Sequence, residues 1–374
     1  MMNVIQNSKT RDYWPTGEWK KSSPVEQHVN PQILNGVTEY LQNRFPYNNR
    51  YVVIRNGYLI FESHNSKPFE NILSIAARKV FLVLTRILKS PNDTFRQRYN
   101  DSDNLRSTTK SIMSILIGIA LENGLIPNLD EKIEKYFPEY FIDNKNEDKK
   151  NITIRNLLMM KSGLANFDKG TAPFKLFFLS RGKWVDFIFR RPMAGNPGED
   201  FDYNSANTHI LSAIISRVSG RTTMDFANEY LFSKLGIKEV HWEQDAQGVN
   251  FGGGNLFMNT YDLAKIAFLF LNNGEWDSKQ IIRREWIEET LTSYHEWLYG
   301  YHYGYLWYMK IEKSEVSGNE FLVYSTAGAG GQKILIVPEL DIIVAATSTT
   351  SLVKDISYHI DLTLGKYIFP AVIK

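Results

Sequence analysis

The order of β-rich and helix-like segments is the feature that most constrains how this chain can fold. Near the start, two β-rich runs within residues 51–62 flank Asn56-Gly57, a pair that favours a two-residue hairpin turn. Segments with helical spacing follow, and the last part of the chain returns to β-rich runs. We predict strands at residues 304–309, 321–324, 332–337 and 342–347.

Helical patterns occupy the middle of the chain and also occur near both ends. We predict helices at residues 30–45, 105–120, 210–218, 261–271, 284–292 and 355–369. Since strands come from both ends and helices from the middle, we expect one mixed α/β body with a helical insert. The cleft between body and insert is the expected site.

Composition excludes several functional classes. The chain has 374 residues and a formal net charge of +2, whereas a nucleic-acid-binding surface needs a strong and clustered basic excess. There is no cysteine, so thiol catalysis, disulfides and thiolate metal sites are excluded. The seven histidines lack the spacing of a metal-binding motif, so we expect neither a metal nor another cofactor.

Two segments bear on compartment and membranes. Residues 1–21 lack the apolar core of a signal peptide, so the protein is either cytoplasmic or extracytoplasmic with its signal already removed. Residues 69–90 are apolar but carry too many embedded basic side chains for a membrane span. Such a segment could lie on a membrane surface. The alternative, which we favour, is a helix packed on the body or a lid near the cleft.

Ser107 and Lys110 lie at the start of the predicted helix 105–120. Residues three apart share one face of a helix, so the serine hydroxyl and the lysine amine can meet. A serine becomes a good nucleophile when a neighbouring base takes its proton, and a lysine can be that base where burial disfavours the ammonium form. The apolar run 112–120 supplies a buried helix, although the same Ser-x-x-Lys spacing recurs twice elsewhere in the chain.

Two further segments have features that bear on a binding site. Residues 165–200 are predicted to be irregular and are rich in aromatic side chains, and long loops of this kind often form the walls of binding sites. The glycine cluster 252–254 lacks the spacing of a nucleotide-binding motif, so we interpret it as a backbone turn.

Three short motifs occur in a characteristic order: Ser107-x-x-Lys110, Tyr203-Asn204-Ser205 and Thr326-Ala327-Gly328. This order resembles that of the serine β-lactamase and penicillin-binding protein superfamily, and most of all its class C-like branch of esterases, D-aminopeptidases, D,D-peptidases and amide hydrolases. The similarity runs from Asp12 to the C-terminal helix, except for residues 69–103. Supporting stretches are 13–16, 152–158, 162–164, 197–203, 262–264, 328–332 and 337–339.

The resemblance implies an α/β (α+β) fold, with an antiparallel sheet flanked by helices, built from both chain ends, and an all-helical insert domain. The expected domains are an N-terminal strap (1–28), an α/β domain (29–101 and 250–374, with a helical insertion near 66–100) and a mainly helical domain (102–249).

The resemblance also implies a role for each matching residue. Ser107 would be the acylated nucleophile, Lys110 would help to deprotonate it, and Tyr203 would carry the proton to the leaving group. The backbone N–H groups of Ser107 and Ala329 would form the oxyanion hole, whose donors are each worth roughly 3–4 kcal/mol of barrier. The residues expected to bind substrate are Ser205, Thr326, Ala327 and Gly328.

Two positions depart from the family pattern. Thr326 stands where lysine or histidine is usual, and a hydroxyl cannot replace the charge that helps to hold a β-lactam carboxylate. Ser205 stands where asparagine is usual, although the nearby Asn204 and Asn207 could compensate. We therefore expect a serine hydrolase, a carboxylesterase or amidase, that acts on an uncharged ester or amide. The aromatic segment 174–189, together with residues 69–90, would shape an apolar acyl pocket.

Several alternatives stay open at this stage. A D,D-peptidase or D-aminopeptidase and a weak β-lactamase would use the same acyl-enzyme chemistry on other substrates. A non-catalytic ligand-binding or sensor domain could keep the same fold, although the presence of Ser107, Lys110 and Tyr203 together argues against it. The expected partner is a small ester or amide, or a short peptide, and not a nucleic acid.

Overall fold

The computed structural model describes residues 10–44, 49–65, 103–169, 182–348 and 355–373. Its main sheet has eight strands in the order β2-β1-β13-β12-β11-β10-β9-β8, and every neighbouring pair is antiparallel. The strands are β1 (Asn49–Arg55), β2 (Tyr58–Asn65), β8 (His295–Glu296), β9 (His302–Tyr303), β10 (Tyr308–Lys313), β11 (Glu320–Gly328), β12 (Gln332–Val337) and β13 (Ile342–Ser348). The sheet thus takes strands from both ends of the chain, and the predicted fold class is confirmed.

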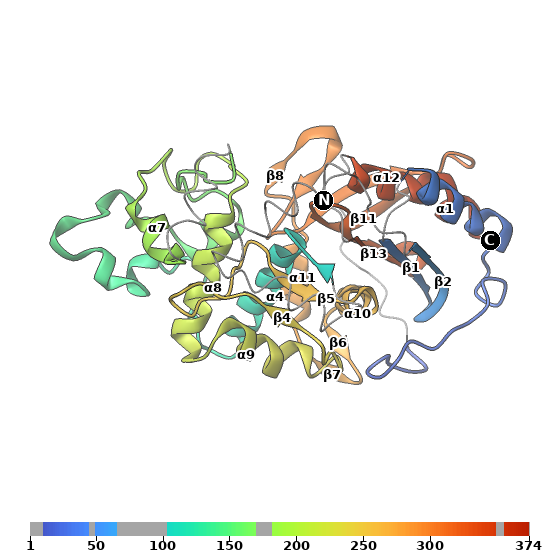
Figure 1. Ribbon diagram of the computed structural model, residues 1–374, viewed down its shortest axis with the longest axis horizontal. Helices are drawn as coiled ribbons and strands as arrows, with labels where there is room; N and C mark the ends of the chain where they lie inside the picture. The colour runs from blue at the N-terminus through green and yellow to red at the C-terminus, as the bar shows by residue number, and fades with distance from the viewer. Residues whose placement is uncertain (1–9, 45–48, 66–102, 170–181, 349–354, 374) are drawn as a thin grey trace, which may run out of the picture.

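Helices cover both faces of this sheet. Side chains alternate between the two faces along each strand, so the apolar strands present apolar side chains on both faces. On one face, Val53 and Val344 belong to the apolar cluster formed with α1 (Pro31–Arg44), α12 (Ile356–Thr363) and α13 (Phe369–Ala371). On the other face, the alternate residues Ile54 and Ile343 join a larger cluster that contains α10 (Thr260–Leu271). Figure 1 shows α1 and α12 on one side of the sheet and α10 on the other.

The hairpin of β1 and β2 follows the predicted turn chemistry. Asn56 and Gly57 have φ angles of 50° and 87°, the left-handed conformation that a type I′ turn requires at both central residues. The aromatic N-terminal segment packs against this region. The Tyr13 hydroxyl donates a hydrogen bond to the Gly57 carbonyl at 2.6 Å, and the Trp19 indole N–H donates to the Tyr261 carbonyl at 3.0 Å.

The remaining elements lie mostly between β2 and β8 in the chain. The helices are α4 (Thr108–Glu122), α5 (Ile154–Leu158), α7 (Trp184–Arg190), α8 (Ser205–Ser219), α9 (Thr223–Ala227) and α11 (Arg284–Thr290). A three-stranded sheet consists of β3 (Asp103–Asn104), β5 (Leu256–Met258) and β4 (His241–Trp242). A two-stranded sheet consists of β6 (Glu275–Trp276) and β7 (Lys279–Gln280). Helix α4 contacts both α8 and β11, and every residue from Thr108 to Ala120 is buried. In Figure 1, α4 accordingly lies between the helices on the left and the main sheet on the right.

Three sequence-based expectations need correction. Of the strand predicted at 304–309, only residues 308 and 309 belong to a strand, β10. Gly304 donates to the Trp307 carbonyl at 2.9 Å and closes a turn between β9 and β10. Residues 165–200 are not wholly irregular, since α7 buries Trp184, Val185, Ile188 and Phe189 on one face. Helix α8 begins at residue 205 rather than 210, because the Asn204 side chain caps it.

Some expectations fall outside the described residues or are not tested by the fold. Two predicted features lie outside the described residues. They are the insertion at 66–100, which includes the segment 69–90, and the part of the aromatic loop at 174–181. The division into strap, α/β domain and helical domain stays a prediction. Among the residues with described positions, none of the helices is long and apolar enough to cross a membrane.

Candidate active site

Ser107 stands at the N-terminus of α4, where a sharp backbone turn delivers it. The preceding residue, Arg106, has a φ of 51°, a left-handed conformation that non-glycine residues adopt at some energetic cost. The side chain of Asn104 supports the turn by accepting from the Arg106 N–H at 2.9 Å. The Leu105 N–H donates to the Leu256 carbonyl at 2.8 Å, which anchors this turn to β5.

The Lys110 amine lies one helical turn further and faces Ser107. Its Nζ is 3.0 Å from the Ser107 Oγ and 2.9 Å from the carbonyl oxygen of Gly253. It also lies 5.0 Å from the ring centroid of Tyr203. Lys110 is 2% exposed, and none of the described carboxylates forms an ion pair with it. Its polar partners are therefore a hydroxyl and a carbonyl, which can accept from the amine before and after it takes a proton.

The carbonyl partner of Lys110 comes from the glycine cluster, whose contribution to the site the sequence analysis missed. A Cβ atom on Gly252 would lie 2.0 Å from the Thr208 carbonyl oxygen, and one on Gly253 would lie 2.7 Å from the Ser205 Cβ. Glycine is required at both positions because α8 packs directly against this backbone. The glycine run signalled a close backbone approach, but nothing in the sequence indicated that Lys110 would be the group bound there.

Tyr203 completes the cluster from the segment that leads into α8. The Asn166 side chain holds its backbone by donating to the Tyr203 carbonyl at 2.7 Å, and the Trp297 ring packs 5.6 Å from the Tyr203 ring. The Tyr308 phenol neighbours that of Tyr203. Burial and then the neighbouring Tyr203 and Tyr303 phenols raise the pKa of Tyr308 well above its usual range. Tyr308 therefore stays protonated near neutral pH.

The asparagines near Ser205 do not supply the group that the second motif usually carries. The Asn204 side chain accepts from the Ala206 N–H at 2.9 Å and donates to the Leu164 carbonyl at 3.0 Å, which makes it a helix cap. The buried Asn207 side chain accepts from the Ser162 hydroxyl instead. Ser205 itself is buried beside Gly253, and Asp168 accepts from its backbone N–H at 2.7 Å. Asp168 is a second contributor to the site that the sequence analysis did not single out.

The third motif lies at the end of β11, beside the start of α4. The Thr326 hydroxyl lies 3.3 Å from that of Thr108 and accepts from the Ile334 N–H at 3.1 Å, so it faces α4. A Cβ on Gly328 would lie 2.4 Å from the Leu105 carbonyl oxygen, so the absence of a side chain permits the close approach of β11 to the turn before Ser107. Ala329 follows directly and is exposed.

Neither the Ser107 nor the Ala329 backbone N–H donates to another group in the described part of the chain. These are the two donors expected to form the oxyanion hole. The roles of Thr326, Ala327, Gly328 and Ser205 in substrate binding stay predictions. The structure brings the Ser107, Lys110 and Tyr203 side chains together.

Comparison with known proteins identifies the family to which this chain belongs. The family model described as Beta-lactamase matches residues 104–358, which is more than half of the chain. The chain belongs to the Beta-lactamase family. Family membership confirms the superfamily expected from the three motifs and the enzyme class, a hydrolase of the β-lactamase type.

Individual relatives and solved structures are similar to this chain at low sequence identity. The 6-aminohexanoate-dimer hydrolase of Paenarthrobacter ureafaciens is 31% identical over 98 residues, which are 26% of this chain and only 25% of that protein. A Bacillus anthracis protein provisionally described as a 6-aminohexanoate-dimer hydrolase is 17% identical with a TM-score of 0.69, covering 99% of this chain and 90% of that one. The hydrolase EstCE1 is 14% identical with a TM-score of 0.67, covering 94% and 100%.

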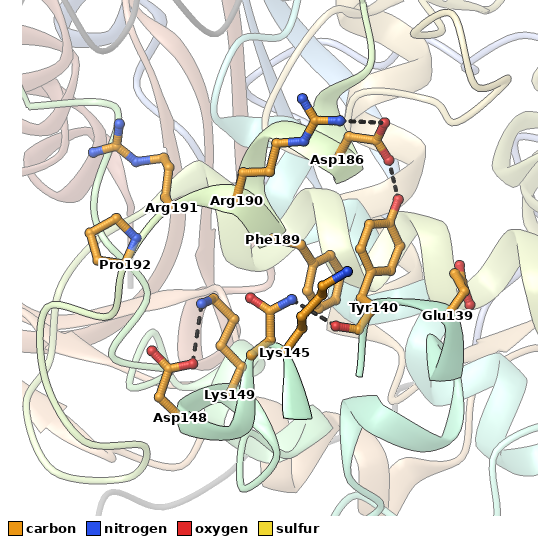
Figure 2. Close-up of a pocket in the computed structure, with 11 residues that line it drawn as sticks. Glu139, Tyr140, Lys145, Asp148, Lys149, Asp186, Phe189, Arg190, Arg191 and Pro192 are labelled. Carbon is orange, nitrogen blue, oxygen red and sulfur yellow. Dashed lines mark hydrogen bonds and ion pairs between the residues drawn. The ribbon is translucent and has the colours of Figure 1, made fainter. Parts of the chain in front are cut away.

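A separate hollow of about 630 Å³ lies away from these residues, on the helical side of this family member (Figure 2). The residues that line it all come from the segments 139–149 and 186–192. Its charges have both signs: Lys149 contacts Asp148 at 3.3 Å, and Asp186 binds the Tyr140 hydroxyl. Since Ser107, Lys110 and Tyr203 are absent from its lining, we assign it no part in the chemistry. No cluster of three or more potential metal ligands occurs among the residues that the structure describes.

Proposed function

We propose that this protein is a serine hydrolase that forms an acyl-enzyme on Ser107 and acts on an uncharged ester or amide. The observation that carries the proposal is the pairing of the Ser107 hydroxyl with the buried Lys110 amine, 3.0 Å away and beside the Tyr203 ring. A hydroxyl needs an adjacent base to attack a carbonyl, and the buried Lys110 amine is placed to act as that base.

The positions of the three side chains support the following first half-reaction. Lys110, which is held by the Gly253 carbonyl, accepts the Ser107 proton while the Ser107 Oγ bonds to the substrate carbonyl carbon. The carbonyl oxygen gains negative charge, which the N–H groups of Ser107 and Ala329 would stabilise. The bond to the leaving group then breaks, and Tyr203 delivers a proton to that group, which departs as an alcohol or amine.

The second half-reaction restores the enzyme. A water molecule gives a proton to the Tyr203 oxygen, which lost its own proton to the leaving group, and attacks the acyl carbon. The bond to the Ser107 Oγ breaks, the carboxylic acid leaves, and Lys110 returns its proton to Ser107.

Two observations favour an uncharged substrate. No lysine or histidine stands at the third motif, and the Thr326 hydroxyl is already engaged with Thr108 and the Ile334 N–H. A β-lactam carboxylate would therefore lack its usual cation at this position. The partial similarity to a 6-aminohexanoate-dimer hydrolase supports amide cleavage but not the preference for an uncharged substrate, since the substrate in that name carries charged ends.

The test compares a short-chain nitrophenyl ester with nitrocefin on the wild type and Ser107→Ala. We expect ester turnover that is lost in the variant and nitrocefin turnover that is much slower. Nitrocefin hydrolysis as fast as ester hydrolysis would contradict the preference for an uncharged substrate. Ester turnover that survives in the variant would contradict the nucleophile.

A further inference from the structure

A cavity of about 690 Å³ lies between the β8–β9 hairpin, strands β10–β12 and helix α12. It is lined by Trp297, Tyr299, Tyr301, Tyr308, Lys310, Ser325, Ala327, Lys333, Asp355, Ser357, Tyr358, His359 and Asp361. Figure 1 shows the β8 hairpin and α12 at the same end of the main sheet. The inference drawn below from this cavity rests on the proposed function.

The cavity adjoins the candidate active site through two side chains. Trp297 lines it and also packs 5.6 Å from the Tyr203 ring. Tyr308 also lines it, and its phenol neighbours that of Tyr203. Ser325 and Ala327 flank Thr326 on β11 and belong to the cavity wall. A substrate that reacts at Ser107 beside Tyr203 can therefore extend one of its ends into this space.

Aromatic rings form much of the wall and stand on both sides of the opening. Trp297, Tyr299 and Tyr301 come from the β8–β9 hairpin, whereas Tyr358 comes from α12. Tyr299 is 87% exposed and Tyr358 is 58% exposed, so ring surface is open to solvent on either side. Large exposed aromatic side chains that face a common space are typical of binding sites, and their rings stack well against another flat ring.

Both lysines of the cavity already have carboxylate partners. The Lys333 Nζ lies 2.5 Å from the Asp361 Oδ2, both residues are buried, and the Tyr301 hydroxyl donates to the same oxygen at 2.7 Å. The Lys310 Nζ lies 2.8 Å from the Glu312 Oε1.

The other titratable groups of the lining add no further cation at neutral pH. Burial and the positive charges of Arg44 and Lys366 lower the pKa of His359, whereas Asp355 adds another carboxylate. The lining, as far as the structure describes it, thus has no unpaired cation to offer a substrate carboxylate.

We propose that this cavity binds an uncharged aromatic group of the ester or amide substrate and discriminates against a carboxylate on that group. An anion placed there would face the Asp355 and Asp361 carboxylates, while both lysines of the lining are already engaged by carboxylates. Such like-charge contacts are unfavourable in a partly desolvated site. A neutral ring gains stacking contacts at no such cost.

The test uses matched esters whose distal phenyl ring carries an uncharged amide, a carboxylate or a quaternary ammonium. The ring is placed on the acyl side in one series and on the leaving group in a second. In at least one series we expect kcat/KM for the neutral ester to exceed that for the carboxylate by about tenfold or more, as like-charge contacts predict. Equal values for these two esters in both series, or a preference for the ammonium ester, would overturn the proposal.

Two variants and a control connect this discrimination to the cavity. Glu312→Gln leaves Lys310 without its carboxylate, so we expect the preference for the neutral ester to fall at least about threefold. Tyr358→Ala should raise KM for the phenyl ester while leaving KM for the corresponding methyl ester unchanged. Glu315→Gln is the control, because Glu315 lies outside the cavity lining, with its carboxylate 3.9 Å from the Lys366 Nζ. It should change neither the preference for the neutral ester nor KM for the phenyl ester.

The results separate this proposal from the proposed function. If Ser107 is acylated and esters turn over but the ring charge has no effect, the aromatic subsite is wrong and the hydrolase assignment stands. If no ester in either series turns over and Ser107 is not acylated, both proposals fail. A selectivity that changes equally in Glu312→Gln and Glu315→Gln would also contradict the role of the cavity.

Discussion

The Lys110 Nζ donates a hydrogen bond to the Gly253 carbonyl oxygen over 2.9 Å, which connects the helix that carries Ser107 to a glycine cluster far along the chain. Because Lys110 is buried, this carbonyl is one of the few groups that fix its direction toward Ser107. The position of the proposed base therefore depends on the backbone of Gly253.

Gly253→Ala tests this dependence. The added Cβ would lie 2.7 Å from the Ser205 Cβ, so the Gly253 carbonyl must shift. We expect kcat/KM for a short-chain ester to fall by up to about 100-fold, the cost of a shift near 1 Å at a catalytic group. Gly254→Ala is the matched control, since its Cβ would have no neighbour closer than 3.5 Å. Similar losses in both variants would contradict a specific role for the Gly253 carbonyl.

Lys110→Met should remove the base while keeping an apolar chain of similar length. We expect kcat to fall by about 10²–10⁴-fold, the usual contribution of a positioned general base. Ser111→Ala, on the next residue of α4, removes another buried group with a carbonyl partner, the Leu306 oxygen at 2.7 Å. That control should lower thermal stability with little effect on kcat. An active Lys110→Met enzyme would exclude Lys110 as the base.

Gly328→Ala should disturb the expected oxyanion hole. Its Cβ would lie 2.4 Å from the Leu105 carbonyl oxygen, which forces β11 and the Ala329 N–H away from Ser107. Loss of one such donor lowers kcat by about 10²–10³-fold. Gly195→Ala, where a Cβ has no neighbour within 4 Å, should have normal kinetics. Steady-state kinetics and circular dichroism on both variants distinguish a lost donor from a lost fold.

The free energy of unfolding should depend on pH through Glu243. Burial raises the pKa of this carboxyl above its ordinary value of 4.5, against the opposing hydrogen bond from Asn255 and the charge of Arg106. The unfolded chain therefore loses this proton at lower pH than the folded protein does. Glu243 accordingly stabilises the fold fully below pH 4.5, and this contribution is lost as the pH rises through the folded pKa.

Urea denaturation midpoints of the wild type and Glu243→Gln at several pH values measure this contribution. The stability of the wild type relative to Glu243→Gln should decline as the pH rises above 4.5. Glu285→Gln, an exposed position on α11, provides the control. A difference between wild type and Glu243→Gln that rises with pH would show that the sign of the shift is wrong.

Much of the fold and part of the site could be predicted from local patterns. The Asn56-Gly57 hairpin follows from turn chemistry, and the meeting of Ser107 with Lys110 follows from helical spacing. Tyr203 had no such local signal, because it lies far along the chain from Ser107 and only the order of motifs pointed to it. The turn at Gly304 and helix α7 were missed because apolar runs of that length do not distinguish strand, turn and helix.

The tertiary contacts that shape the site were beyond sequence reasoning. The Gly253–Lys110 bond and the Lys333–Asp361 pair each join distant residues, and nothing in their spacing indicates a contact. The directions of the Asn204 and Asn207 side chains also depend on contacts made only in the folded chain. Asn204 accepts from the Ala206 N–H as a helix cap, and Asn207 accepts from the Ser162 hydroxyl.

The most direct test of the account is intact-mass spectrometry after incubation with a fluorophosphonate, on the wild type and Ser107→Ala. The central claim is that Ser107 is a nucleophile activated by Lys110 and Tyr203. It predicts one covalent adduct per wild-type chain and none on the variant. An unlabelled wild type that binds ligands without turnover would contradict the claim, as would an adduct that persists in Ser107→Ala.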